Sequence, residues 1–83
     1  MGDLELDRSR AIWKQIAEEI SRRIASGAYP QGERLPGLVD LASEFGVAVS
    51  TIQKVFAHLK TNGEVRTELG LGTWPVSPEE RQG

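Results

Sequence analysis

Hydrophobic residues recur at helical spacing in three separate segments of the chain. The first segment has a single apolar stripe formed by Ile12, Ile16, Ile20 and Ile24, with Trp13 and Ala17 beside it. This period places the stripe on one face of a helix. Asp7 or Ser9 can cap the start of this helix, and Gly27 can adopt the left-handed conformation that ends it. The pattern therefore predicts a helix over residues 9–26.

Two shorter stripes follow a segment that is rich in glycine and proline. Residues 27–37 contain three glycines and two prolines, which predicts turns around a short extended piece at Arg34–Leu35. The later stripes are Leu38, Leu41, Ala42 and Phe45, and then Ile52, Val55, Phe56 and Leu59. The second helix ends at Gly46 and the third at Asn62–Gly63. The few residues between Gly46 and the third helix give the spacing of a helix-turn-helix.

The segment after the third helix has the pattern of a β-hairpin. Two runs, at residues 65–67 and 73–76, flank the glycine-rich residues 68–72. Pro75 confines the second strand to the edge of a sheet, because proline has no N–H to donate. Three helices followed by a hairpin predict a winged helix-turn-helix, a fold that is mainly α with a small β-hairpin. We expect this domain to cover residues 9–76, between a flexible tail at 1–8 and a disordered tail at 77–83.

The length and composition exclude most catalytic functions. A chain of 83 residues can build one small core. The absence of cysteine removes disulfides, thiolate zinc sites and cysteine nucleophiles. One histidine, His58, is too few for a metal site or for acid–base chemistry on so small a scaffold. We therefore expect no enzyme, no metal and no cofactor.

Neither a membrane span nor an export signal is predicted. No apolar run approaches the length that crosses a membrane, and the amino terminus lacks the basic start and apolar stretch of a secretory signal. We expect a cytoplasmic protein.

The charge distribution bears on the choice of partner. The net charge is −2 and the isoelectric point is about 5.3, whereas nucleic-acid-binding domains are usually basic. The acidic residues are concentrated near the two ends of the chain. Residues 8–66 carry nine Lys and Arg against six Asp and Glu. The central segment is therefore mildly basic, which weakens the objection to a nucleic-acid partner.

Several fragments, in this order and spacing, carry a resemblance to a known family. They include Ile12-Trp13-Lys14-Gln15-Ile16, Gly32-Glu33-Arg34-Leu35-Pro36, Leu41-Ala42, Phe45-Gly46-Val47, Thr51-Ile52-Gln53-Lys54-Val55-Phe56 and Gly70-Leu71-Gly72-Thr73. Residues 12–76 resemble the amino-terminal DNA-binding domain of GntR-type bacterial transcriptional regulators, and most of all their short YtrA-type branch. The family's carboxy-terminal effector or dimerisation domain has no counterpart in these residues, so we expect a standalone domain.

The chain departs from the family pattern at positions that usually serve DNA. Gly37 stands where a serine usually opens helix two, and Val39 stands where an arginine is usual. Val49 replaces an arginine or a proline. The wing tip, often basic in the family, is Glu68, Leu69 and Leu71 here. Three of the phosphate-side charges that the resemblance implies are therefore missing.

The resemblance implies a sequence-specific regulator of transcription, a repressor, that binds double-stranded DNA. The third helix would enter the major groove, where Gln53 could pair with an adenine edge and Lys54 could reach guanine or a phosphate. Glycines in the wing would let its backbone lie against the minor groove. The candidate DNA-binding residues are Arg34, Gly37, Ser50, Thr51, Gln53, Lys54, Lys60, Arg66, Gly70, Gly72 and Thr73. Without the dimerisation domain we expect a monomer in solution that dimerises on adjacent half-sites of DNA.

A second hypothesis is a winged helix that acts as a protein-interaction adaptor with little or no DNA binding. The acidic balance, Val39, Val49 and the wing-tip pair Leu69 and Leu71 favour it, because exposed leucines suit a protein partner better than a phosphate. The two hypotheses differ on whether the cations Arg34, Lys54, Lys60 and Arg66 form one continuous basic face.

Overall fold

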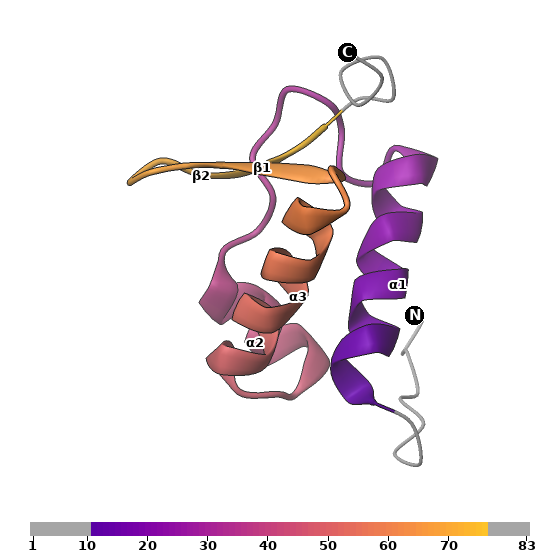
Figure 1. Ribbon diagram of the computed structural model, residues 1–83, viewed down its shortest axis with the longest axis vertical. Coiled ribbons are helices and arrows are strands. Elements are labelled where there is room, and N and C mark those ends of the chain that lie inside the picture. The colour runs from indigo at the N-terminus through magenta and orange to yellow at the C-terminus, as the bar shows by residue number, and fades with distance from the viewer. Residues whose placement is uncertain (1–10, 77–83) are drawn as a thin grey trace.

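Three helices and one hairpin form the part of the chain that the computed structural model describes, residues 11–76 (Figure 1). The elements are α1 (Ile12–Ser26), α2 (Leu38–Phe45), α3 (Val49–Thr61), β1 (Val65–Glu68) and β2 (Gly72–Pro75). The strands are antiparallel, with Arg66 opposite Trp74 and Thr67 opposite Thr73. This is the predicted winged helix-turn-helix. The two tails predicted at residues 1–8 and 77–83 lie outside the described residues.

The ends of the helices follow from local backbone chemistry. Gly27 has φ 87° and Gly46 has φ 68°, so both end their helices in the left-handed conformation, as predicted. The predicted start of the first helix at residue 9 is wrong. Ala11 has a non-helical backbone and α1 begins at Ile12, where the apolar stripe itself begins. The two predicted caps, Asp7 and Ser9, lie outside the described residues.

One apolar stripe from each helix builds the core. Six side chains are no more than 1% exposed: Ile16, Ile20, Leu41, Ile52, Val55 and Leu59. Leu35 from the linker and Val65 from β1 close the core beneath the hairpin. The short helix α2 contributes Leu41 and Ala42, which pack against α3 and so supply the stability that two helical turns lack alone. The periodicity therefore identified the core correctly.

Arg23 joins α1 to α2. Its guanidinium donates hydrogen bonds to Glu44 Oε2 at 2.5 Å, to Glu19 Oε2 at 2.9 Å and to the Tyr29 hydroxyl at 2.6 Å. Hydrogen bonds from Arg22, which also pairs with Glu19, and from Arg23 hold the pKa of Glu19 below its ordinary value. Both arginines are thus ion-paired on the surface of α1.

The linker after α1 runs beside the hairpin. The Leu35 N–H donates to the Thr73 carbonyl at 2.8 Å, so the short extended piece at Arg34–Leu35 lies along β2. The Arg34 side chain continues past Gly72, and its Nη1 donates to the Leu71 carbonyl at 2.9 Å. The linker therefore fixes the position of the hairpin relative to the helices.

Replacing Gly72 with alanine is expected to loosen this attachment. Gly72 has φ 132°, which side-chain-bearing residues rarely adopt, and an added Cβ would lie 2.3 Å from Arg34 Cδ. We expect Gly72→Ala to lower the free energy of unfolding by about 1–3 kcal/mol in urea titrations. Gly70→Ala is the matched control, because Gly70 also has a positive φ but its Cβ would meet nothing within 4 Å. Equal stability of the two variants would contradict the role of Gly72.

Candidate nucleic-acid interface

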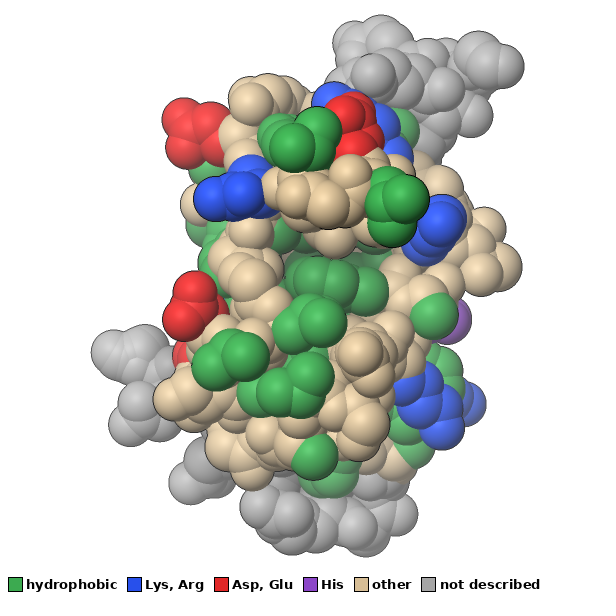
Figure 2. All heavy atoms as spheres, turned by 90° about the vertical axis from the view of Figure 1, so that its left-hand side faces the viewer, with side chains coloured by type: hydrophobic (Ala, Val, Ile, Leu, Met, Phe, Trp, Pro, Cys, Tyr) green, Lys and Arg blue, Asp and Glu red, His purple; other side chains and the backbone are tan. Residues whose placement is uncertain are grey.

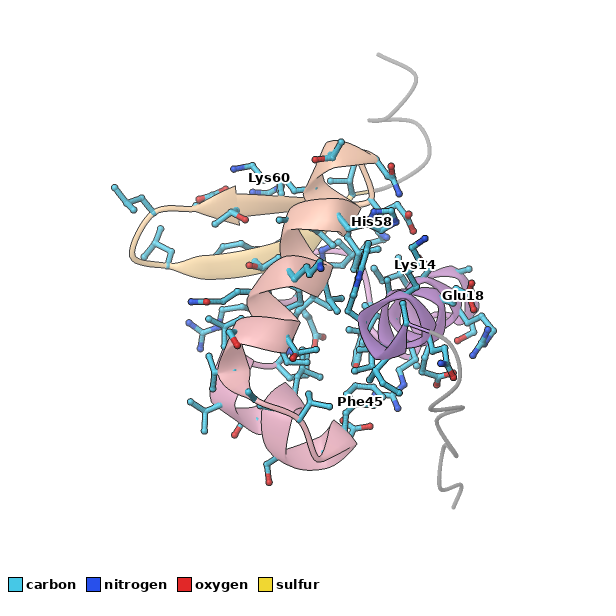
Figure 3. All side chains as sticks on the ribbon, turned by 60° about the horizontal axis from the view of Figure 1, so that its bottom comes forward. Lys14, Glu18, Phe45, His58 and Lys60 are labelled. Carbon is cyan, nitrogen blue, oxygen red and sulfur yellow. The ribbon has the colours of Figure 1, made fainter. Side chains whose placement is uncertain are left out.

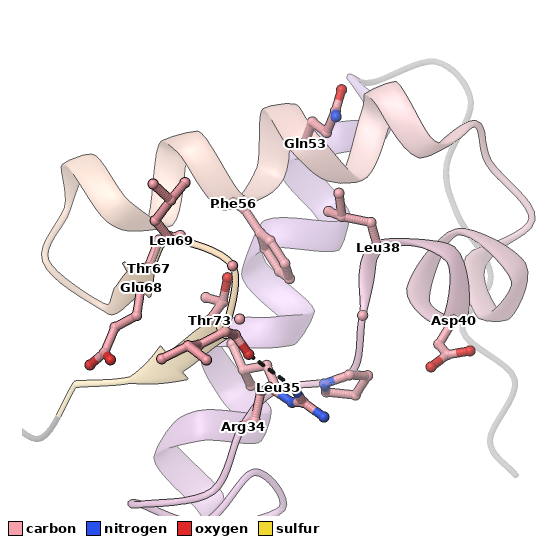
Figure 4. A pocket seen from close by; sticks show the side chains of 15 residues that line it. Arg34, Leu35, Leu38, Asp40, Gln53, Phe56, Thr67, Glu68, Leu69 and Thr73 are labelled. Atoms are coloured by element: carbon pink, nitrogen blue, oxygen red, sulfur yellow. Dashed lines mark hydrogen bonds between the residues drawn. The ribbon is translucent and has the colours of Figure 1, made fainter.

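A groove lies between α3, the start of α2 and the hairpin (Figure 4). Gln53 and Phe56 line it from α3, Leu38 lines it from α2, and residues 67–73 line it from the hairpin. The linker residue Leu35 is buried beside it. The groove thus brings the third helix and the wing to one face of the molecule, as the winged-helix interpretation requires.

The outward side of α3 carries small side chains and one amide. Its buried residues are Ile52, Val55 and Leu59. Its exposed positions near the amino end are Val49, Ser50 and Gln53, and Ala57 is exposed one turn later. Thr51 is half-buried. The predicted candidates Ser50 and Gln53 therefore lie on the surface of α3, where a DNA edge could reach them.

Lys54 lies on the flank of α3 that faces α1. Its Nζ is 5.0 Å from the centre of the Trp13 ring, and Lys14 Nζ is 5.9 Å from the same ring. His58 meets Trp13 edge-to-face, with ring centres 5.1 Å apart. Lys14 and His58 also line a second hollow between the two helices (Figure 3). The sequence did not predict that Lys14 joins Lys54 and His58 around Trp13, because spacing within α1 does not show which residues of α3 lie opposite.

The other predicted cations are held separately. The Arg34 guanidinium bonds the Leu71 carbonyl. Arg66 forms an ion pair with Glu68, and its guanidinium lies 5.3 Å from the centre of the Trp74 ring. Lys60 is exposed in the last turn of α3. Lys54 thus lies against α1, Arg34 against the hairpin turn and Arg66 against Trp74 of β2. These three cations and Lys60 therefore do not form one continuous basic face.

The middle of this face is apolar. Among residues 11–76, four large hydrophobic side chains are exposed: Val39 by 70%, Val49 by 36%, Leu69 by 100% and Leu71 by 58%. Figure 2 shows hydrophobic side chains over the centre of the face, with Lys and Arg at its margins. Both departures from the family pattern in the helices, Val39 and Val49, are therefore on the surface and not in the core.

The remaining predicted residues differ in their accessibility. Gly37 immediately precedes α2 with an extended backbone, and Gly70 lies at the exposed hairpin turn with φ 76°. Thr73 is only 9% exposed, and its carbonyl is occupied by the Leu35 N–H. Thr73 therefore supports the hairpin from below and offers little surface to a ligand.

Residues 11–76 contain neither a group of metal-binding side chains nor a membrane-spanning helix. No group of three His, Asp or Glu side chains in this range could hold a metal ion. No helix in the same range is long and apolar enough to cross a membrane.

Comparisons with known proteins identify relatives of this geometry. The family model for bacterial regulatory proteins of the gntR family matches residues 12–74. An uncharacterised HTH-type transcriptional regulator of Rhizobium meliloti is 40% identical over 63 residues, which cover 76% of this chain and 26% of that protein. The chain spans about a quarter of the length of the first curated relatives it matches.

Solved structures show the same fold. YtrA from Sulfolobus acidocaldarius, a GntR-family transcription factor, has a TM-score of 0.79 and 29% identity, over 92% of this chain and 82% of that one. AraR(DBD) in complex with operator ORX1 has a TM-score of 0.76 and 27% identity, over 92% of this chain and 93% of that one.

Proposed function

This chain belongs to the gntR family of bacterial regulatory proteins, and from that premise we propose that it is a transcriptional repressor that binds double-stranded DNA in a sequence-specific manner. The observation that carries the proposal is the shared face of α3 and the hairpin, with an accessible amide at Gln53 between them. The likeness to AraR(DBD), which is bound to an operator in its structure, supports it.

The geometry supports separate roles for α3 and the hairpin in DNA binding. The exposed amino-terminal part of α3 enters the major groove, where small side chains allow the helix to approach the base edges. The hairpin turn at Gly70 lies at the minor groove, because it extends from the same face. Lys54 lies on the flank of α3 beside Trp13, and in the complex it contacts the phosphate backbone and not a guanine.

The domain acts by binding alone, in the cytoplasm, without catalysis, metal or cofactor. It represses transcription by occupying a site that overlaps a promoter. A reporter whose promoter contains a selected binding site should lose expression when the chain is produced, and a reporter with a scrambled site should not. Expression that rises with the intact site would identify an activator.

The direct test of DNA binding is a titration against mixed-sequence duplex DNA in 50 mM salt, followed by selection of preferred sites from a random pool. Lys54→Gln should weaken binding to all duplexes by a similar factor, since phosphate contacts carry no sequence information. Arg22→Gln is the matched control, because it removes the same charge from a residue paired with Glu19 on α1. Absence of binding by the intact chain would overturn the proposal.

A second candidate function is that of a protein-interaction adaptor. The exposed pair Leu69 and Leu71 at the wing tip, together with Val39, favours it, because an apolar patch of this kind suits a protein partner. The four candidate cations do not form one continuous basic face, and this favours it as well. The two functions are separated by the same titration. If the double variant Leu69→Ser and Leu71→Ser binds DNA as tightly as the parent chain, the wing-tip leucines do not contact DNA and remain available to a protein partner.

We expect the chain to be a monomer in solution at micromolar concentration. The described fold has one small core and buries its helix stripes within the chain, which leaves no helix stripe to pair with a second copy. Any dimer would form on adjacent half-sites of DNA. Sedimentation velocity measures this directly, and a tight dimer without DNA would contradict it.

A further inference from the structure

The outward stripe of α3 has an unusual chemistry for a helix that enters the major groove. The exposed residues on this side of the helix are Val49, Ser50, Gln53 and Ala57. They offer methyl groups, one hydroxyl and one amide. Val49 and Gln53 are four residues apart, so their side chains are neighbours on the helix surface. Together they form a contiguous patch that holds no charge, which we call the α3 methyl–amide stripe (Val49, Ser50, Gln53 and Ala57).

The two lysines of α3 border this stripe and are not part of it. Lys54 is turned toward Trp13 of α1, with 5.0 Å between its Nζ and the ring centre. Lys60 belongs to the last turn, beyond Ala57. The stripe therefore has no arginine or lysine with which to hold the two acceptors on the edge of a guanine.

The chemistry of the stripe matches the edge of an A·T base pair. In the major groove an adenine presents one donor and one acceptor, and a glutamine amide can form a hydrogen bond with each of them. A thymine presents its C5 methyl group, which apolar side chains contact. No other base carries that methyl. Val49 next to Gln53 would thus meet a thymine methyl one step from the adenine that the amide reads.

We infer that this chain selects its DNA site by thymine methyl groups, with Val49 as the specificity-determining residue beside Gln53. The inference rests on the proposed function and names the class of site, a half-site with A·T pairs under the amino-terminal part of α3. Val49 stands where the resemblance implies an arginine or a proline, and it is exposed. In this arrangement it strengthens DNA binding by burying apolar surface against the thymine methyl, without an ion pair.

The test replaces thymine with deoxyuridine, one position at a time, in a duplex selected from the random pool. This change removes only the C5 methyl and leaves the base pairing and the minor groove intact. We expect one position next to the adenine read by Gln53 to lose about 4-fold in affinity, the loss expected from one buried methyl-sized group. Thymines elsewhere in the duplex should tolerate the change.

Two variants link the effect to Val49. In Val49→Ala the intact and the deoxyuridine duplex should bind equally at that position, because the apolar partner of the methyl has been shortened. Val49→Thr is the matched control, since it keeps a methyl group and the branched shape and should retain much of the discrimination. Val49 is on the surface, so circular dichroism should show unchanged folding in both variants.

The outcomes separate this inference from the proposed function. Selected sites that place G·C pairs under α3 would overturn the inference while DNA binding stands. Uniform tolerance of deoxyuridine at every position would overturn it in the same way. Failure of the pool to yield any bound duplex would overturn the proposed function itself, and the inference with it.

Discussion

Raising the salt concentration from 50 to 200 mM is expected to weaken DNA binding about 60- to 250-fold. Each neutralised phosphate contributes about −0.9 to the slope of log affinity against log salt. The candidates for these contacts are Arg34, Lys54, Lys60 and Arg66, so about four phosphates give a slope of about −3 to −4. The slope reaches about −4 only if the ion pair between Arg66 and Glu68 opens so that Arg66 can contact a phosphate. If Arg66 stays paired with Glu68, the slope is about −3. Fluorescence anisotropy across the salt range measures the slope.

The variant Val39→Arg provides the internal check on this slope. Val39 lies on the surface at the second position of α2, where the family usually has an arginine, and is 70% exposed. An arginine there should deepen the slope by about one unit if the start of α2 lies along the phosphate backbone. The adaptor hypothesis expects no dependence of this kind. If the intact chain binds no duplex in 50 mM salt and Val39→Arg does not restore binding, the DNA-binding proposal is wrong, and the wing-tip leucines are the first place to look for a protein partner.

The family resemblance and the winged-helix fold follow from the sequence because they depend on local patterns. Each helix has one apolar stripe at a regular period, and a glycine with positive φ stands at or directly after each helix end, so periodicity and turn chemistry suffice. The family model and the YtrA structure confirm this assignment. The start of α1 differs from the predicted residue 9 because the backbone of Ala11 is not helical, and the apolar period alone does not show where the first helical turn begins.

The arrangement of the candidate site could not be predicted from spacing. The contacts that position it join residues far apart in the chain, such as Lys54 to Trp13 and Arg34 to Leu71. These depend on how helices and linker pack, which no local pattern specifies. The packing places Lys54 on the flank of α3 and holds the Arg34 side chain against the hairpin.

Thr73 is a case in which a local rule could have corrected a resemblance. Successive side chains of a strand point to opposite faces, so Thr73 and Pro75 share one face and Trp74 the other. Thr73 and Pro75 are buried in the structure and Trp74 is half-buried. The alternation therefore assigns Thr73 to the inner face of the hairpin, even though the family fragment that contains it suggests a DNA contact.

Removal of the Gln53 amide should relax sequence preference more than it weakens binding. Gln53 is the one side chain of the α3 methyl–amide stripe that carries an amide, which can form two hydrogen bonds with one base edge, so its loss should cost about 1–3 kcal/mol at a single base pair. That corresponds to a discrimination about 5- to 150-fold smaller at that pair. Affinity for mixed-sequence duplex should change little, because the phosphate contacts remain.

Site selection from a random pool with Gln53→Ala measures this effect. Alanine is the better helix former, so the variant should fold at least as well as the parent chain. Gln31→Ala is the matched control, since Gln31 is an exposed glutamine in the linker, outside the groove between α3 and the hairpin. The control should select the parent's sites, whereas Gln53→Ala should select sites with one degenerate position. If both variants select the parent's sites, Gln53 reads no base, and α3 meets the major groove through its methyl groups alone.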